Sequence, residues 1–163
     1  MNEMQSAKSR RSEAGTSMTG HTVSGDGCSA ESGAARLYGS VRAACASGGD
    51  FAERVDAGLA AALSLLAADP DLSRHLVLGS DQEALAAQRR WVASFGELLR
   101  EAAADLPGAS SGPRLRETLL IDGIRLQLGR RVLAGEAARM EELRPELLRI
   151  VMACYLDVEA GPK

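Results

Sequence analysis

Few side chains in this 163-residue sequence are of types that perform chemistry, and they lie far apart. The two histidines are His21, within a polar N-terminal stretch, and His75. His75 follows Asp71 by four residues, a spacing at which two side chains of one helix can pair. No nucleophile accompanies them, so we interpret the pair as a surface contact. The sequence therefore favours a protein that is not an enzyme.

Metal and cofactor sites are not indicated either. Cys28, Cys45 and Cys154 share no close spacing, and we interpret them as reduced thiols of a cytoplasmic protein. The sequence contains no His-Glu-x-x-His motif and no glycine-rich loop that follows a strand pattern. We expect no metal and no cofactor.

Two polar and aromatic pairs within the apolar pattern are the remaining candidates for a binding site. Asp122 and Arg125 are three residues apart and either pair on the surface or hold a polar group of a ligand. Trp91 and Phe95 form an aromatic cluster that either fills the core or lines a small-molecule pocket. The residues alone leave both alternatives open.

The elements that must position these residues are predicted to be helices throughout. Residues 1–35 are rich in Ser, Thr, Gly and charge, so we expect a disordered tail. From residue 36 to 160, apolar residues recur at helical rather than strand spacing. The net charge of −3 argues against a basic nucleic-acid surface, and no long apolar stretch indicates a membrane span. The predicted fold class is an all-α helical bundle.

Local signals place the first long helix of this region. Asp50 suits an N-cap, and Glu53 stands at the reciprocal position of a capping box. Asp69-Pro70 is predicted to end this helix and begin a short one. One apolar stripe follows the cap at steps of three and four: Phe51, Val55, Leu59, Leu63 and Leu66.

The last two helices have a different pattern. The helix predicted to start at Pro113 and the one after Pro145 are both apolar on more than one side. Gly135 is predicted to end the first, and a short polar turn over 136–143 connects them. A helix that is apolar on two sides needs a second packing partner.

The order of these pieces resembles a known family. The stretch "FAERVDAGLAAALSLLAADPDLSRHLVL" is similar to the first long helix, break and short helix of the C-terminal domain of tetracycline-repressor-like (TetR/AcrR) transcriptional regulators. The stretch "LLIDGIRLQLGRRVLAGEAARMEELRPELLRIVMACYLDVEA" resembles that family's last two helices, with a Gly-Glu step, a Leu-x-Pro-Glu-Leu entry and a closing Tyr-Leu-x-x-x-Ala. The residue after Tyr-Leu is often glycine in the family and is Asp157 here.

The resemblance implies a sensor domain that binds a small apolar or amphipathic effector. In the family, the last two long helices pair with those of a second copy, which implies a homodimer. The implied interface residues are Leu120, Ile124, Leu128, Leu147, Val151 and Tyr155. The implied ligand-binding residues are Leu63, Leu66, Trp91, Phe95, Leu119 and Asp122.

The N-terminal stretch departs from the family. These regulators bind DNA through an N-terminal helix-turn-helix, whereas residues 1–35 lack the apolar side chains that such a unit must bury. We therefore expect no DNA binding unless a helix-turn-helix is supplied elsewhere, as in a heterodimer with a full-length regulator. Two other classes remain open from sequence: a small helical enzyme or carrier with an apolar pocket, and a helical protein-interaction adaptor.

Overall fold

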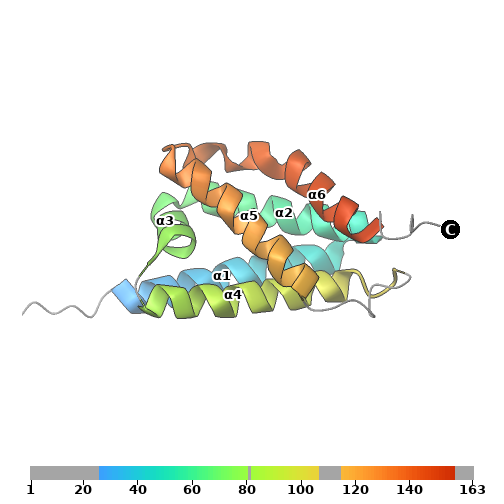
Figure 1. The fold of residues 1–163 in the computed structure, drawn as a ribbon, viewed down its shortest axis with the longest axis horizontal. Coiled ribbons are helices and arrows are strands. Elements are labelled where there is room, and N and C mark those ends of the chain that lie inside the picture. Colours follow the sequence, from blue (N-terminus) through green and yellow to red (C-terminus); the bar gives the residue numbers. More distant parts are fainter. Residues whose placement is uncertain (1–25, 81, 107–114, 157–163) are drawn as a thin grey trace, which may run out of the picture.

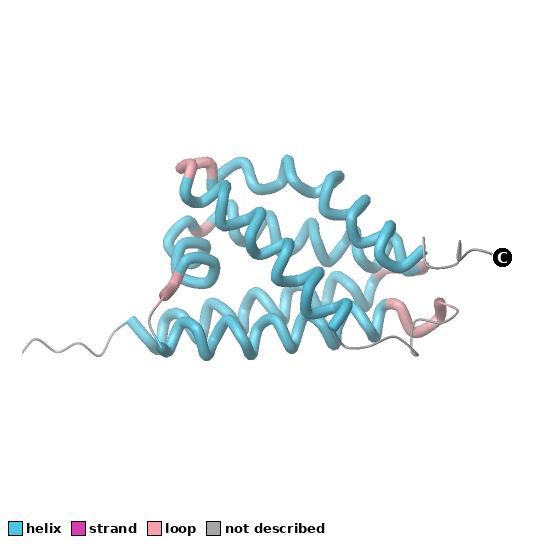
Figure 2. Tube along the Cα trace, in the orientation of Figure 1, coloured by secondary structure: helices cyan, strands magenta, loops and turns pink. Residues whose placement is uncertain are grey.

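The computed structural model describes residues 26–80, 82–106 and 115–156. This part of the chain consists of helices joined by short connections and has no strand, which confirms the all-α prediction (Figure 2). The elements, in chain order, are α1 (Asp26–Ser47), α2 (Phe51–Ala68), α3 (Pro70–Leu78), α4 (Gln82–Ala102), α5 (Leu115–Leu133), the 3-10 helix η2 (Ala137–Leu143) and α6 (Arg144–Leu156).

The ends of α2 follow the local signals in the sequence. The Asp50 carboxylate accepts a hydrogen bond from the Glu53 backbone N–H at 2.9 Å, and the Glu53 side chain accepts one from the Asp50 backbone, which completes the capping box. At the other end, Asp69 accepts from the Leu72 backbone N–H at 3.0 Å and so caps α3. The predicted capping box and the predicted break at Asp69-Pro70 are both confirmed.

The helices pack as a bundle in which α2 has neighbours on opposite sides. In Figure 1, α1 and α4 run side by side along one edge, α6 lies along the opposite edge, and α5 crosses diagonally between them. Helix α2 packs against α1 on one side and against η2 and α6 on the other. The start of α6 is tied to α2, because Arg144 Nε donates to Asp56 Oδ1 at 2.7 Å.

Helix α1 begins at Asp26, whereas the disordered tail was predicted to extend to residue 35. Residues 26–35 are helical, so this part of the disorder prediction is wrong, while residues 1–25 lie outside the described part. Gly33 is buried against Leu72 of α3, and Ala34 packs on the core. These small residues fit closely against another helix, a contact that a count of large apolar side chains does not detect.

The segment predicted as a polar turn is instead part of the core. Gly135 has φ of +74°, a left-handed conformation that favours glycine, and it ends α5 as predicted. The following 3-10 helix buries Ala137, Met140 and Leu143. With three residues per turn, residues three apart lie on one side, so these side chains form a single inward face.

No described helix is both long enough and apolar enough to cross a membrane.

Candidate functional site

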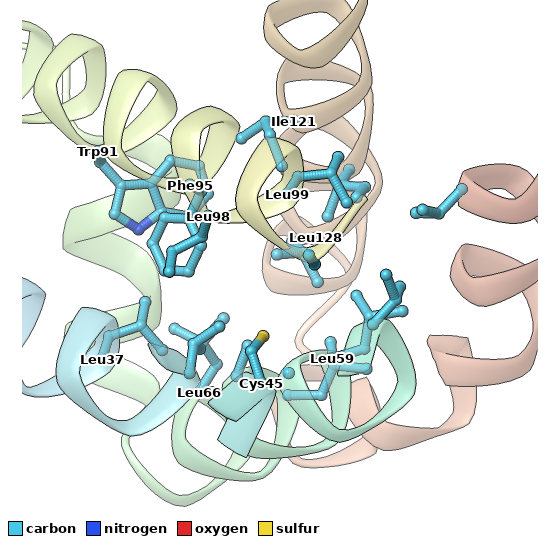
Figure 3. A pocket seen from close by; sticks show the side chains of 18 residues that line it. Leu37, Cys45, Leu59, Leu66, Trp91, Phe95, Leu98, Leu99, Ile121 and Leu128 are labelled. Atoms are coloured by element: carbon cyan, nitrogen blue, oxygen red, sulfur yellow. The ribbon is translucent and has the colours of Figure 1, made fainter. Parts of the chain in front are cut away.

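An apolar cavity of about 90 Å³ lies inside the bundle. Helices α2 and α5 face each other across it, α1 and α4 close two further sides, and α6 contributes one residue (Figure 3). The lining residues are Leu37, Val41, Cys45, Val55, Gly58, Leu59, Ala62, Leu63, Leu66, Trp91, Phe95, Leu98, Leu99, Ala102, Ile121, Ile124, Leu128 and Val151.

The wall of the cavity carries no charge. All the lining side chains are apolar except the Cys45 thiol and the indole N–H of Trp91. Burial raises the pKa of the Cys45 thiol more than a backbone hydrogen bond lowers it, so the thiol stays neutral at physiological pH. Gly58 faces Cys45, and a Cβ at that position would lie only 2.6 Å from the sulfur. Glycine therefore lets α1 and α2 approach closely beside the cavity.

Aromatic rings form one side of the cavity. The rings of Trp91 and Phe95 lie 5.1 Å apart, and Tyr38 meets Phe95 edge-on at 5.8 Å. The Trp91 Nε1 atom is buried and has no hydrogen-bond partner. Figure 3 shows this nitrogen on the edge of the indole that faces Leu37 and Leu66 across the cavity. The site therefore combines a large apolar wall with a single unused donor.

Four of the six predicted ligand-binding residues come together here: Leu63, Leu66, Trp91 and Phe95. Leu119 and Asp122 are not among the residues that line this cavity. Leu119 is 63% exposed on the outer face of α5. Asp122 pairs with Arg125, whose Nε lies 3.4 Å from Asp122 Oδ1, at a surface depression between α4 and α5. For this pair, the surface alternative holds.

The residues predicted for a dimer interface lie mostly inside the single chain. Five of them are buried in the core of the single chain: Leu120, Leu128, Leu147, Val151 and Tyr155. Leu120 and Leu147 also line a surface groove between α5 and α6. Ile124 is half-buried and contacts both the cavity and a surface groove between α5 and α6. The last two helices are apolar on two sides, but these residues form the inner side.

A buried polar cluster, which was not predicted from the sequence, lies at one end of the bundle. Glu117 of α5 is only 2% exposed. Its carboxylate accepts a hydrogen bond from the Tyr155 hydroxyl at 2.9 Å and one from Arg100 Nη2 at 2.8 Å. Arg116 also pairs with Glu117, and its guanidinium carbon lies 4.0 Å from the centre of the Tyr155 ring. This Glu117 cluster joins α4, α5 and α6.

The hydrogen bonds of this cluster decide which groups are ionised. Burial acts to raise the pKa of Glu117, but hydrogen bonds from its own backbone, Tyr155 and Arg116, with the charge of Arg100, hold that pKa below its usual range. Burial and the adjacent carboxylate raise the pKa of Tyr155 far above its ordinary value, so its hydroxyl stays a donor. The cluster is a structural tie with fixed protonation states and does not border the cavity.

The sequence did contain a signal for this cluster. Glu117 precedes Ile121, Ile124 and Leu128 at steps of four, three and four, which places it in the apolar row that faces the core. A charged residue in such a row requires buried partners.

Within the described residues, no group of three or more His, Cys, Asp or Glu side chains is arranged to hold a metal ion. His75 lies in the last turn of α3 and is not among the residues that line the cavity. No protein-family model, curated protein or solved structure matches this chain.

Proposed function

We propose that residues 36–160 are a sensor domain of the TetR/AcrR type, which binds a small apolar effector and homodimerises. The uncharged apolar cavity is the observation that supports this function most directly. A ligand pocket is typically concave and apolar with few polar groups, and this cavity has that character. DNA contact would come from a helix-turn-helix supplied elsewhere, for example by a full-length regulator as partner.

The size of the cavity limits its ligand. A volume of about 90 Å³ is below the ~300–1,000 Å³ of common ligand pockets. An engineered apolar cavity of ~150 Å³ is known to bind benzene. The resting cavity is therefore smaller than one known to hold benzene, and a ligand of benzene size or larger must displace lining side chains such as Leu59 or Phe95.

We expect benzene to bind this cavity and to raise the thermal midpoint of unfolding, because it binds only the folded state. Trp91 is the only tryptophan and lines the cavity, so its fluorescence reports binding directly. Ala62→Leu adds side-chain volume inside the cavity and should abolish both signals. The matched control is Ala43→Leu, an exposed site on α1, which should leave both signals intact. A wild-type chain that shows neither signal at saturating benzene contradicts the proposed sensor function.

The dimer surface is proposed on the outer face of α5. Leucines that are more than half exposed lie on this face, opposite the core-facing row: Leu115, Leu119, Leu126 and Leu133. The last three are seven residues apart and so share one side of the helix. A groove of about 380 Å³ between α5 and α6 flanks them, with Gly123 and Ile150 among its lining residues. We refer to the four leucines as the outer leucine row.

The leucine row and the groove make this face suitable for a second copy of the chain. Both lie on the same face, so a twofold axis can place the leucines of each copy against the groove of the other. At Gly123, a Cβ would meet nothing within 4 Å, so the surface is open there to an incoming side chain. Exposed apolar patches of this kind commonly mark protein contacts.

Leu126→Glu should raise the dissociation constant of this dimer about a hundredfold. The substitution occurs in both copies, and each copy loses about 1.5 kcal/mol or more of stabilisation from the buried leucine. Leu126 is 56% exposed in the single chain, so the fold should tolerate the change. Light scattering with size-exclusion chromatography across a concentration series measures the dissociation constant. Leu85→Glu, at an exposed leucine on α4, is the control and should leave the dimer unchanged. A wild-type chain that is monomeric at micromolar concentration rules out the proposed interface.

A further inference from the structure

We propose that the cavity recognises a neutral apolar molecule that carries one hydrogen-bond acceptor, such as a ketone, aldehyde or ester, and that the indole N–H of Trp91 donates to this acceptor. The inference rests on the proposed function, since it requires that the cavity bind a ligand. It adds the chemical class of that ligand.

The unused donor is the first reason. An indole N–H donates and does not accept, and buried donors in folded proteins nearly always have a partner. Trp91 Nε1 is buried without one, beside a cavity that its own ring lines. Its nitrogen-bearing edge faces Leu37 and Leu66 across that space (Figure 3). A bound molecule can therefore place an acceptor against this N–H.

Water fits the cavity poorly as the missing partner. A buried water is held by about two to four polar groups. Among the lining side chains, only the Cys45 thiol accompanies the Trp91 N–H, and a thiol is a weak hydrogen-bonding group. An acceptor attached to an apolar body satisfies the N–H and fills the rest of the cavity with matching surface.

The wall also excludes an ionised ligand. No lining residue carries a charge, and burial holds the pKa of the Cys45 thiol above its usual value, so it stays uncharged. A carboxylate or ammonium group would lose its hydration here without gaining a counter-charge. A neutral acceptor is the remaining class, because it needs only one donor.

A pair of ligands with the same shape tests the inference. Cyclohexanone has a carbonyl oxygen where methylenecyclohexane has a CH₂ group, so the two differ mainly in the acceptor. The single tryptophan gives one indole N–H resonance in a ¹⁵N-labelled full-length chain. We expect cyclohexanone to move this resonance downfield and methylenecyclohexane to bind without that shift. The comparison on the wild-type chain stands even where a variant does not fold.

The Trp91→Phe variant measures how much the donor contributes to affinity, because it keeps an aromatic ring and removes the N–H. It should lower the affinity for cyclohexanone about three- to tenfold and leave the affinity for methylenecyclohexane about unchanged. Leu66→Val, on the apolar wall, is the control and should change both affinities by a similar factor.

The outcomes separate this inference from the proposed function. Binding of both ligands without a downfield shift, and with equal loss in Trp91→Phe, overturns the acceptor inference and leaves the cavity as a binding site. If neither ligand binds at its solubility limit, the proposed function fails and the inference fails with it.

Discussion

Replacing Glu117 with alanine should lower the free energy of unfolding by about 3 kcal/mol, the cost expected when one partner is removed from a buried ion pair. The carboxylate is almost fully buried and accepts hydrogen bonds from Arg100 and Tyr155 on two other helices. Without it, the Tyr155 hydroxyl is left buried without its acceptor. The two arginines that pair with Glu117 are largely buried, so they cannot regain full hydration without moving.

Urea unfolding followed by circular dichroism measures this loss. Glu101→Ala, which removes an exposed carboxylate from α4, is the matched control and should change stability by less than about 0.5 kcal/mol. Tyr155→Phe should give a smaller loss than Glu117→Ala, about 1 kcal/mol, because it removes one neutral donor and leaves the arginines paired. Equal stability of Glu117→Ala and the control would show that the Glu117 cluster does not tie the helices together.

The same cluster predicts a dependence on pH. The folded-state pKa of Glu117 lies below its value in the unfolded chain, about 4.3. Ionised Glu117 therefore contributes stability above that pH, and the contribution is lost as the pH falls through the lower folded-state pKa. As the pH falls below about 5, the free energy of unfolding should therefore decrease less for Glu117→Gln than for the wild type.

Met140→Ala should destabilise the chain by about 2–5 kcal/mol, the range for a fully buried methionine. Met140 has no exposed surface and belongs to the main core with Leu63, Leu66 and Leu147. Truncation removes its contacts and leaves a void between α2 and η2, since the packing around it can close only in part.

The neighbouring Glu141 provides the control for this prediction. It lies in the same 3-10 helix and is exposed, so Glu141→Ala should change stability by less than about 0.5 kcal/mol. Thermal and urea unfolding of the two variants measure the difference. Similar stability of Met140→Ala and Glu141→Ala would contradict the placement of η2 against the core.

Features that depend on neighbours in the chain were predictable from the sequence. The Asp50–Glu53 capping box and the Asp69-Pro70 break arise from contacts within a few residues, so the pattern of residue types indicates them directly. The α2 stripe was predictable for the same reason, since one apolar side of a helix has only one way to face a core. Leu63 and Leu66, which lie on it, are buried and line the cavity.

Helix α5 shows where sequence reasoning reaches its limit. Leu119 and Leu120 are both leucines on a helix that is apolar on two sides, yet Leu119 is exposed and Leu120 is buried. Their directions differ by about 100°, and the helical period does not say which side meets the bundle. The predicted interface therefore consisted mostly of residues that face inward, whereas the outer leucine row faces outward.

The sequence by itself determined that the described part of the chain is helical, where α2 begins and ends, that α5 ends before Gly135, and which side of α2 is buried. These follow from backbone capping and from one-sided apolar patterns, which act over a few residues. Only the tertiary structure decided which side of α5 is inner, that Met140 lies in the core, and that Glu117 meets Arg100 and Tyr155. The reason is physical: burial and ion pairing depend on helices far apart in the chain, and the local pattern does not contain their packing.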